Sequence, residues 1–538
     1  MKYLTAAASV ALAAPLVAAS QLVWPSKWDE LEDLMTMQSG YDTRGFSDAV
    51  VTCSFGNNEQ GRQNTAEWIR TGFHDMITHN AAAGTGGLDA SIFWELDRAE
   101  NPGAAFTNTF SFFSGFYNTR ASASDLVALG VSVATGACGG PKVPFRAGRI
   151  DAGKAGPPGV PEPHTNLEKT LDAFVTAGFD NKDMVAMVAC GHAIGGVHSV
   201  DFPDITGIHA EVGNDTTLPF QNDVSTFHNG VVTEFLNGKT KNPLVVAKND
   251  TLNSDKRIFN SDRATMKKLA TRTNFNSMCG DIFARMVDTV PKSVQLTDVI
   301  DPYDVKPYIS ELSLDSKGDL HFSGFIRMRA THGTGRNQDD LAVTLLYADR
   351  NGKGQVEVPT KRAQLQSGLT GGLNGELFVS FEFDTTIKGA TGISKFLVKE
   401  ITPSTKATRI HDNQKTGGYK VNDKVLYQLS TSCNQVGNSA SSTITINAMV
   451  RSDCAGDNPL TLKLTQKKAR KGTDVPALVV QSTAFKKTGK APKGWVAYQV
   501  KANTDDQFAR FDIALGGKNP TAVEFQSVGA LPETCAKQ

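Results

Sequence analysis

Residues 70–75 read Arg70-Thr71-Gly72-Phe73-His74-Asp75, inside a segment from Asn64 to Met76 whose apolar residues recur at helical spacing. On a helix, Arg70 and His74 stand four positions apart, so both side chains point to one face. A cation beside an imidazole can act on a peroxide, because the imidazole moves the proton while the cation stabilises the charge that develops as the O–O bond breaks. Ordinary helix surfaces show the same spacing, so the neighbouring motifs decide what it means.

The segment after this helix is rich in oxygen ligands. Residues 86–91 read Gly86-Gly87-Leu88-Asp89-Ala90-Ser91, which places a carboxylate and a hydroxyl near glycine backbone carbonyls. Together with the carboxylate of Asp75, these groups suit a hard cation such as calcium. The calcium ligands that we expect are Asp75, Gly87, Asp89 and Ser91.

Two further motifs concern the chemistry of histidines. Glu95 and Asn101 follow the oxygen-rich segment, and an asparagine carbonyl that accepts from the Nδ1–H of a histidine leaves Nε2 free as a base. Residues 189–198 read Ala189-Cys190-Gly191-His192-Ala193-Ile194-Gly195-Gly196-Val197-His198. This pattern predicts a histidine on a helix followed by small residues, which let a planar macrocycle approach the backbone.

These motifs, in this order, resemble those of the plant, fungal and bacterial haem peroxidase superfamily over roughly residues 45–290. The residues that match the family's distal side, where peroxide binds, are Arg70, Phe73, His74, Glu95 and Asn101. The residues that match its distal calcium ligands are Asp75, Gly87, Asp89 and Ser91.

The resemblance extends to the opposite, proximal side of the haem. His192 falls at the position of the family's iron ligand, and Asp255 resembles the carboxylate that accepts a hydrogen bond from that ligand. Cys53 and Cys138 resemble a disulfide pair of the secreted fungal members.

The resemblance implies haem b as the cofactor, with His192, Asp255 and Phe73 as the residues that hold it. It implies that hydrogen peroxide is reduced and an organic electron donor is oxidised through a ferryl intermediate. His74 takes the proton of peroxide and returns it to the leaving oxygen, while Arg70 stabilises the departing charge. The expected protein is an oxidoreductase of the response to oxidative stress, with hydrogen peroxide and a small reducing substrate as partners.

The chain departs from the secreted members at several positions. Ala193 stands where calcium-binding members carry Ser or Thr, and His228 stands where they carry Asp, so we expect calcium on the distal side alone. The spacing of the two histidines in residues 192–198 resembles ascorbate and cytochrome c peroxidases instead. Glu67 and Met187 match too little of the manganese-binding and surface-tryptophan patterns to support either specialised substrate.

The N-terminus indicates the compartment. A short basic start precedes an Ala-rich apolar run from Leu4 to Ala19, and small residues occupy positions 18–20. This pattern is typical of a secretory signal peptide over residues 1–20. We therefore expect a secreted, extracellular glycoprotein with glycosylation sequons at Asn214 and Asn249.

Composition limits the partners. The chain of 538 residues carries 55 basic and 55 acidic side chains, so its formal net charge is zero. A neutral chain argues against nucleic-acid binding through bulk charge. Since no run inside the chain approaches the ~18 apolar residues that span a bilayer, we expect neither nucleic acid nor membrane as a partner.

The pattern changes near residue 300, from helical periodicity to alternation of polar and apolar residues in runs rich in Val, Thr, Ile and Phe. Such runs predict antiparallel β-strands. The expected chain is multi-domain, with an all-α haem peroxidase domain over residues 21–300 and a β-rich extension of two β-sandwich units over residues 305–415 and 420–538. The join between the units is expected at Lys415–Gly418.

Weak similarity between two parts of the extension suggests a tandem repeat. Asp340–Leu345 followed by Leu377–Phe381 resembles Asn458–Leu464 followed by Trp495–Tyr498. The basic run Lys463–Lys471 is expected to be a solvated turn, with a patch for an anionic polymer as the alternative.

The seven cysteines are an odd number, so at least one lacks a disulfide within the chain. Cys190 is expected to be a small buried apolar residue rather than a reactive thiol. One disulfide is expected among Cys433, Cys454 and Cys535, and the pairing of these residues, of Cys190 and of Cys279 stays open.

A rival hypothesis gives the β units the main role. They would attach the protein to a cell wall or another polymer, and the helical domain would be a haem-binding relic. The presence of Arg70, His74, Asn101, His192 and Asp255 argues against a relic.

Overall fold

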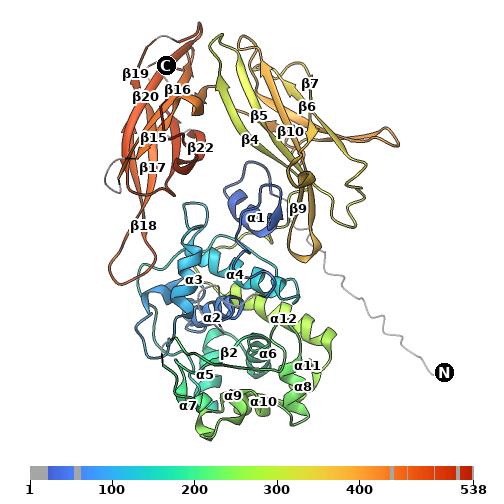
Figure 1. The fold of residues 1–538 in the computed structure, drawn as a ribbon, viewed down its shortest axis with the longest axis vertical. Helices are drawn as coiled ribbons and strands as arrows, with labels where there is room; N and C mark the ends of the chain where they lie inside the picture. The colour runs from blue at the N-terminus through green and yellow to red at the C-terminus, as the bar shows by residue number, and fades with distance from the viewer. Residues whose placement is uncertain are drawn as a thin grey trace, which may run out of the picture.

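The fold of this chain comes from a computed structural model, which describes residues 22–53, 62–211, 213–436, 441–456, 459–489, 491–516 and 521–535. The expected signal peptide, residues 1–20, lies outside the described residues. Figure 1 shows a helical part at one end of the molecule and two β-rich parts at the other, with a short N-terminal helix between them. No described helix is long and apolar enough to cross a membrane.

The helical part forms as the sequence pattern predicts. Its helices are α1 (Asp29–Thr36), α2 (Asn64–Met76), α3 (Ala105–Phe113), α4 (Ala123–Ala137), α5 (Leu167–Ala177), α6 (Asn181–Gly191), α7 (Pro203–Thr206), α8 (Gly230–Leu236), α9 (Pro243–Val246), α10 (Ser254–Ser261), α11 (Arg263–Leu269) and α12 (Arg272–Val287). Two 3₁₀ turns, η1 (Ser91–Trp94) and η2 (Asp250–Leu252), and one short hairpin, β2 (Gly196–His198) with β3 (Thr217–Pro219), connect them.

Local signals explain where the two most important helices lie. The amphipathic pattern of residues 64–76 coincides with α2. In α6, Asp180 accepts a hydrogen bond from the backbone of Asp183, and the Asp183 side chain accepts one in return, which is a capping box. α6 ends at Gly191, so His192 stands at its C-terminal end. One hydrophobic cluster with Trp68 and Phe113 among its members fills the space between the helices.

Two disulfide bonds link segments of the helical part that are far apart in the sequence. Cys53 pairs with Cys138, as the family resemblance implied. Cys190 is buried, as expected, and pairs with Cys279, which answers a pairing that the sequence left open. The two residues are 89 positions apart, and local sequence cannot reveal that α6 and α12 bring them together. Cys433 pairs with Cys535, and Cys454 is free among the described cysteines.

The C-terminal region is β-rich and antiparallel, as predicted. Its first strands are β4 (Val305–Leu314), β5 (Leu320–Arg329), β6 (Ala342–Ala348), β7 (Val356–Pro359), β8 (Lys361–Arg362), β9 (Leu369–Gly371), β10 (Leu377–Ile387), β11 (Lys395–Thr402), β12 (Ala407–His411) and β13 (Tyr419–Lys420). The later strands are β14 (Val425–Tyr427), β15 (Cys433–Val436), β16 (Ser442–Arg451), β17 (Leu460–Lys468), β18 (Ala477–Ala484), β19 (Lys486–Lys487), β20 (Trp495–Thr504), β21 (Arg510–Leu515) and β22 (Thr521–Ser527).

These strands form several sheets with a recurring order. The first half has β9-β10-β5-β4 in one sheet, extended by β1 (Ser39–Gly40), and β12-β11-β6-β7 in another. The second half has β19-β20-β16-β14 and β22-β21-β17-β18. Residues from both sheets of a half share one hydrophobic cluster. The matching orders agree with the suggested repeat, and the division into two β-sandwich units stays a prediction.

The chain passes from the first half to the second between Lys420 and Val425, because β13 still pairs with β11 and β14 already pairs with β16. The join expected at Lys415–Gly418 therefore lies too early in the chain. Asp423 sits in this crossing and forms ion pairs with Arg350 on one side and Arg451 on the other.

Both halves contact the helical part, by different means. α1 docks on the first half through buried charges, since Nζ of Lys306 lies 2.8 Å from Glu32 and 2.7 Å from Asp33. The second half reaches the helical part with the loop between β17 and β18. In that loop, Val475 is buried in the helical part's own hydrophobic cluster. The basic run Lys463–Lys471 is not a solvated turn throughout, because β17 extends to Lys468 and Arg470 is half-buried.

Candidate active site

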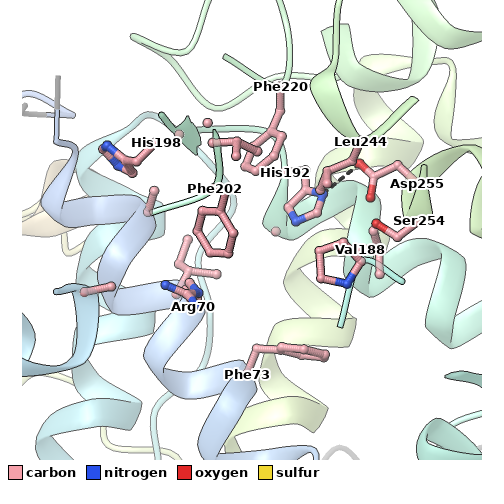
Figure 2. Close-up of a pocket in the computed structure, with 18 of the residues that line it drawn as sticks. Arg70, Phe73, Val188, His192, His198, Phe202, Phe220, Leu244, Ser254 and Asp255 are labelled. Carbon is pink, nitrogen blue, oxygen red and sulfur yellow. Dashed lines mark hydrogen bonds and ion pairs between the residues drawn. The ribbon is translucent and has the colours of Figure 1, made fainter. Parts of the chain in front are cut away.

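A cavity of about 620 Å³ lies in the helical part, between α2 and the C-terminal end of α6. Arg70, Phe73 and His74 line it from α2, and His192 and Asp255 line it from the opposite side. Figure 2 shows this arrangement, with Arg70 and Phe73 on one side and His192 bonded to Asp255 on the other. The structure thus brings together residues that are up to 185 positions apart (70 to 255).

The environment of His74 makes it a neutral base. Its Nδ1 lies 2.9 Å from Oδ1 of Asn101, and Nδ2 of Asn101 donates to the backbone carbonyl of Glu95 at 3.0 Å. Because the amide nitrogen of Asn101 is used in that way, its oxygen must accept, which places the proton of the imidazole on Nδ1 and leaves Nε2 bare. Burial, together with the charge of Arg70, lowers the pKa of His74 to about 3.

The group of Glu95 that positions Asn101 is its backbone carbonyl, which accepts the hydrogen bond; the carboxylate is not involved. The carboxylate accepts instead from the backbone N–H of Gly156 at 2.6 Å and pairs with Arg98 at 2.9 Å. The carboxylate of Glu95 therefore holds the loop at Gly156, and its backbone carbonyl orients Asn101.

Arg70 is half-buried beside His74 on the same face of α2, as the spacing predicts. Its Nη2 donates to the backbone carbonyl of Pro102 at 3.1 Å, and the guanidinium lies 4.7 Å from the ring centroid of Phe106. Burial lowers the pKa of Arg70 to about 10, so the group stays charged at neutral pH. A permanent cation next to a neutral base is the arrangement that peroxide cleavage needs.

His192 has a different partner. Its Nδ1 lies 2.8 Å from Oδ2 of Asp255, a carboxylate that is fully buried. Nδ2 of Asn242 donates to the same carboxylate oxygen at 2.7 Å, while the other oxygen has no hydrogen-bond partner within the described chain. The ring of Phe220 stacks on the imidazole, with centroids 4.0 Å apart.

Sequence reasoning missed Asn242 and Phe220. Both come from segments between the helices, and neither lies in a motif with a local signature. Asn242 is the N-cap of α9, and its side chain also accepts from the backbone of Leu244, so the sequence alone marks it as a helix cap.

The cavity fits a haem group. Two histidines face it from opposite walls, and apolar side chains such as Val188, Phe202 and Phe220 line it between them. A Cβ added at Gly191 would meet nothing within 4 Å, so the wall next to His192 is open to a planar ring. By contrast, a Cβ at Gly195 would lie 2.5 Å from Ala66, so this glycine serves the packing of the chain against α2.

The expected calcium ligands gather around η1. Asp75 accepts hydrogen bonds from the backbone N–H groups of Ala90 (2.7 Å) and Ile92 (2.9 Å), and from the Ser91 hydroxyl at 3.3 Å. Burial and the neighbouring charge of Asp89 raise the pKa of Asp75 well above its ordinary value. Two carboxylates that repel each other beside a hydroxyl suit a hard cation. The described residues contain no group of three or more His, Cys, Asp or Glu that could hold a metal ion.

Gly87 has the backbone conformation that this turn requires. Its φ is +104°, and a Cβ there would lie 2.6 Å from the carbonyl oxygen of Thr289. On the proximal side, the carbonyl of Ala193 accepts from Gln221 at 2.5 Å, and Nδ1 of His228 accepts from the backbone of Gly230 at 3.0 Å.

The rim of the cavity carries charged pairs. Nε of Arg62 lies 2.8 Å from Glu67, and Nδ1 of His198 lies 2.5 Å from Asp215. The partners of Glu67 and His198 are thus protein groups. Asn214, one of the two sequon residues, is exposed next to Asp215, and Asn249 is exposed as well. Their glycosylation stays a prediction.

Comparison with known proteins gives three kinds of relative. A family model described as Peroxidase matches residues 49–276. A WSC domain-containing protein of Arthroderma benhamiae is 36% identical over 526 residues, which is 95% of this chain and 68% of that protein. L-ascorbate peroxidase 5, peroxisomal, of Arabidopsis thaliana is 31% identical over 32% of this chain and 58% of its own length.

The third relative is the mitochondrial cytochrome c peroxidase of Emericella nidulans, which is 31% identical over 137 residues. That match covers 24% of this chain and 38% of the relative. The chain therefore spans about two thirds of the first relative and less of the other two. The match to the first relative covers the β-rich region as well, whereas the other two relatives match shorter stretches.

Proposed function

The chain belongs to the plant, fungal and bacterial haem peroxidase superfamily, and we propose that it is a secreted haem peroxidase that reduces hydrogen peroxide with electrons from a small organic donor. The observation that carries this proposal is the pair of histidines on opposite walls of one cavity, one with a neutral amide partner and the other with a carboxylate. A relic would have no need to keep both partners.

Each residue of the site has a role that follows from its contacts. His192 presents Nε2 to the cavity, and Asp255 withdraws the proton density on Nδ1, which makes the imidazole a stronger electron donor to iron. Asn242 holds Asp255 in place through its hydrogen bond. When bound, haem supplies the redox chemistry; the protein supplies binding, orientation and charge.

On the opposite wall, the bare Nε2 of His74 takes a proton from bound peroxide and returns it to the leaving oxygen. Arg70, charged and half-buried beside it, stabilises the negative charge on that oxygen. Phe73 and Phe174 both line the cavity, with ring centroids 5.8 Å apart, and form an apolar wall against which haem would lie.

We also propose one calcium ion held by Asp75, Gly87, Asp89 and Ser91. Its purpose follows from the chain: Asp75 is covalently next to His74, so a cation on this loop fixes the end of α2 that carries the base. Contact of the β-rich region with a cell wall or another polymer is a further proposal, whose support is the length of this region.

The experiment is an absorption spectrum of the purified full-length protein after addition of haem. We expect a Soret band that changes within the mixing time when hydrogen peroxide is added and returns when a small phenol is supplied as donor. Haem binding with no response to peroxide would overturn the proposal and favour the relic, and absence of a Soret band would overturn both.

A further inference from the structure

The loop between β17 and β18 joins the second half of the β-rich region to the helical part. Figure 1 shows this hairpin extending from its sheet toward α3. Val475, at its tip, is 2% exposed and belongs to the hydrophobic cluster of the helical part. Nζ of Lys467 donates to the backbone carbonyl of Ser114 at 2.6 Å, and Arg120 pairs with Glu524 at 2.7 Å beside it.

Arg470 makes the contact that matters for the site. Its guanidinium lies over the indole of Trp94, 4.9 Å from the ring centroid. Its Nε donates to the carbonyl of Val475 at 2.9 Å, so the buried tip holds the guanidinium in place. A cation on the face of a tryptophan is an attractive contact, and it strengthens when water is excluded.

Trp94 is the last residue of η1, and its indole is held from two directions. The ring lies under Arg470, and Nε1 donates to the carbonyl of Ala152 at 3.1 Å. The backbone N–H of Ala152 donates to the carbonyl of Asp89 at 2.7 Å, which ties the same loop to the start of η1. The β17–β18 hairpin thus contacts η1, and both ends of η1 are held by hydrogen bonds to Ala152.

That turn is connected to the distal histidine by two routes. At its beginning, the N–H groups of Ala90 and Ile92 donate to the carboxylate of Asp75, the residue next to His74. At its end, the carbonyl of Glu95, the residue after Trp94, accepts from Asn101, which in turn bonds to Nδ1 of His74. Both routes pass through η1, so the position of η1 sets the position of the base.

We propose that the β17–β18 hairpin is a brace for the distal histidine, in which Arg470 is a positioning residue that acts on His74 through Trp94 and η1. The proposal rests on the proposed peroxidase function for its kinetic consequence, but its structural part concerns residues of this chain alone. It gives the second half of the β-rich region a role in the catalytic domain. Lys467 and Arg470 are engaged in this contact, which removes them from an anionic-polymer patch.

The test compares three full-length variants: Arg470→Ala, the conservative Arg470→Lys, and Lys471→Ala as a matched control on the exposed part of the same loop. The first readout is hydrogen exchange of the amides of residues 88–96, measured without peroxide. We expect Arg470→Ala to raise exchange there on the order of three- to ten-fold, the usual size of a partly buried cation–π contact. Lys471→Ala should match the parent, and Arg470→Lys should recover part of the protection.

The second readout is kinetic, on the haem-loaded protein. Arg470→Ala should slow the reaction with peroxide while the haem content and the KM for the small donor stay at the parental values, because the brace acts on the base alone. A double variant of Arg470→Ala with Trp94→Leu should cost less than the sum of the two single changes, since each single change removes the cation–π contact.

The outcomes separate the two proposals. Unchanged exchange at residues 88–96 in Arg470→Ala would overturn the brace, whatever the activity of the parent protein. Equal loss in Lys471→Ala would also overturn it, since the effect would then belong to the whole loop. A parent protein that does not react with peroxide would overturn the peroxidase, while the exchange measurement would still decide whether η1 depends on Arg470.

Discussion

His74 and His192, which face the cavity from opposite walls, differ in what holds their Nδ1 atoms. Asn101, a neutral amide, lies 2.9 Å from His74, whereas Asp255, a buried carboxylate, lies 2.8 Å from His192. The distances are nearly equal, so geometry does not distinguish the two rings; the charge of the partner does. An amide fixes the tautomer and leaves a base that can accept a proton, while a carboxylate raises the basicity of the whole ring and strengthens it as a ligand for a metal.

The second level of support differs as well. Asn101 is oriented by a backbone carbonyl on η1, and Asp255 is oriented by the side chain of Asn242. The distal side is therefore sensitive to whatever moves the backbone of η1, including the β17–β18 hairpin. On the proximal side, the Cys190–Cys279 disulfide fixes the end of α6 next to His192 to α12. The position of His74 therefore depends on contacts made outside the cavity, whereas the segment next to His192 is held by a covalent bond.

The largest effect is expected when the imidazole of His192 is removed. His192→Ala should lose tight haem binding, because His192 is the histidine at the end of α6 whose partner is the buried carboxylate of Asp255. Haem content after gel filtration measures it, and added imidazole should restore part of the binding. Parental haem content without imidazole would contradict the assignment of His192.

Removal of the distal ring should leave haem in place. His74→Leu should slow the reaction with peroxide by ~10²–10⁴, the usual value of general acid–base help. Stopped-flow mixing with peroxide measures it. His164→Ala is the matched control, since this side chain is 63% exposed and its nearest acidic partner, Glu162, lies 3.8 Å away. A parental rate in His74→Leu would show that another group is the base.

Exchange of the partners sharpens the comparison. Asp255→Asn keeps the shape of the side chain but removes its charge, and Asn101→Ala removes the amide. Each change should lower haem affinity or activity roughly 10–100-fold, as is usual for groups that orient a ligand. We expect the two losses to fall on different quantities. Asp255→Asn should raise the reduction potential of the bound haem, measured by redox titration, and Asn101→Ala should slow the peroxide reaction at an unchanged potential. Potential shifts of equal size in both variants would contradict the division of roles.

The smallest effect should come from removal of calcium. Metal analysis of the purified protein should find one ion per chain, and chelation should lower the peroxide rate on the order of a few-fold with haem content unchanged, because the cation acts only on the position of α2. Two ions would show that the proximal side also binds calcium despite Ala193 and His228. If the analysis finds no ion, the distal side does not bind calcium.

The sequence by itself determined the features that depend on nearby residues. The i, i+4 spacing of Arg70 and His74 places both on one face of α2, because the geometry of a helix is local. Alternating runs after residue 300 likewise predicted antiparallel strands. Resemblance to the family added what spacing could not: the pairing of Cys53 with Cys138 and the partnership of His192 with Asp255, which are 63 positions apart.

Only the tertiary structure decided the contacts between segments that have no common pattern. Asn242 reaches Asp255 and Phe220 reaches His192 from segments between the helices, and Cys190 meets Cys279 because α6 packs on α12. The Lys463–Lys471 run has the composition of a solvated turn, yet Arg470 lies on Trp94, 376 positions away (94 to 470). Periodicity reports which face of an element is apolar but not which distant element covers it; that choice depends on the packing of the whole chain.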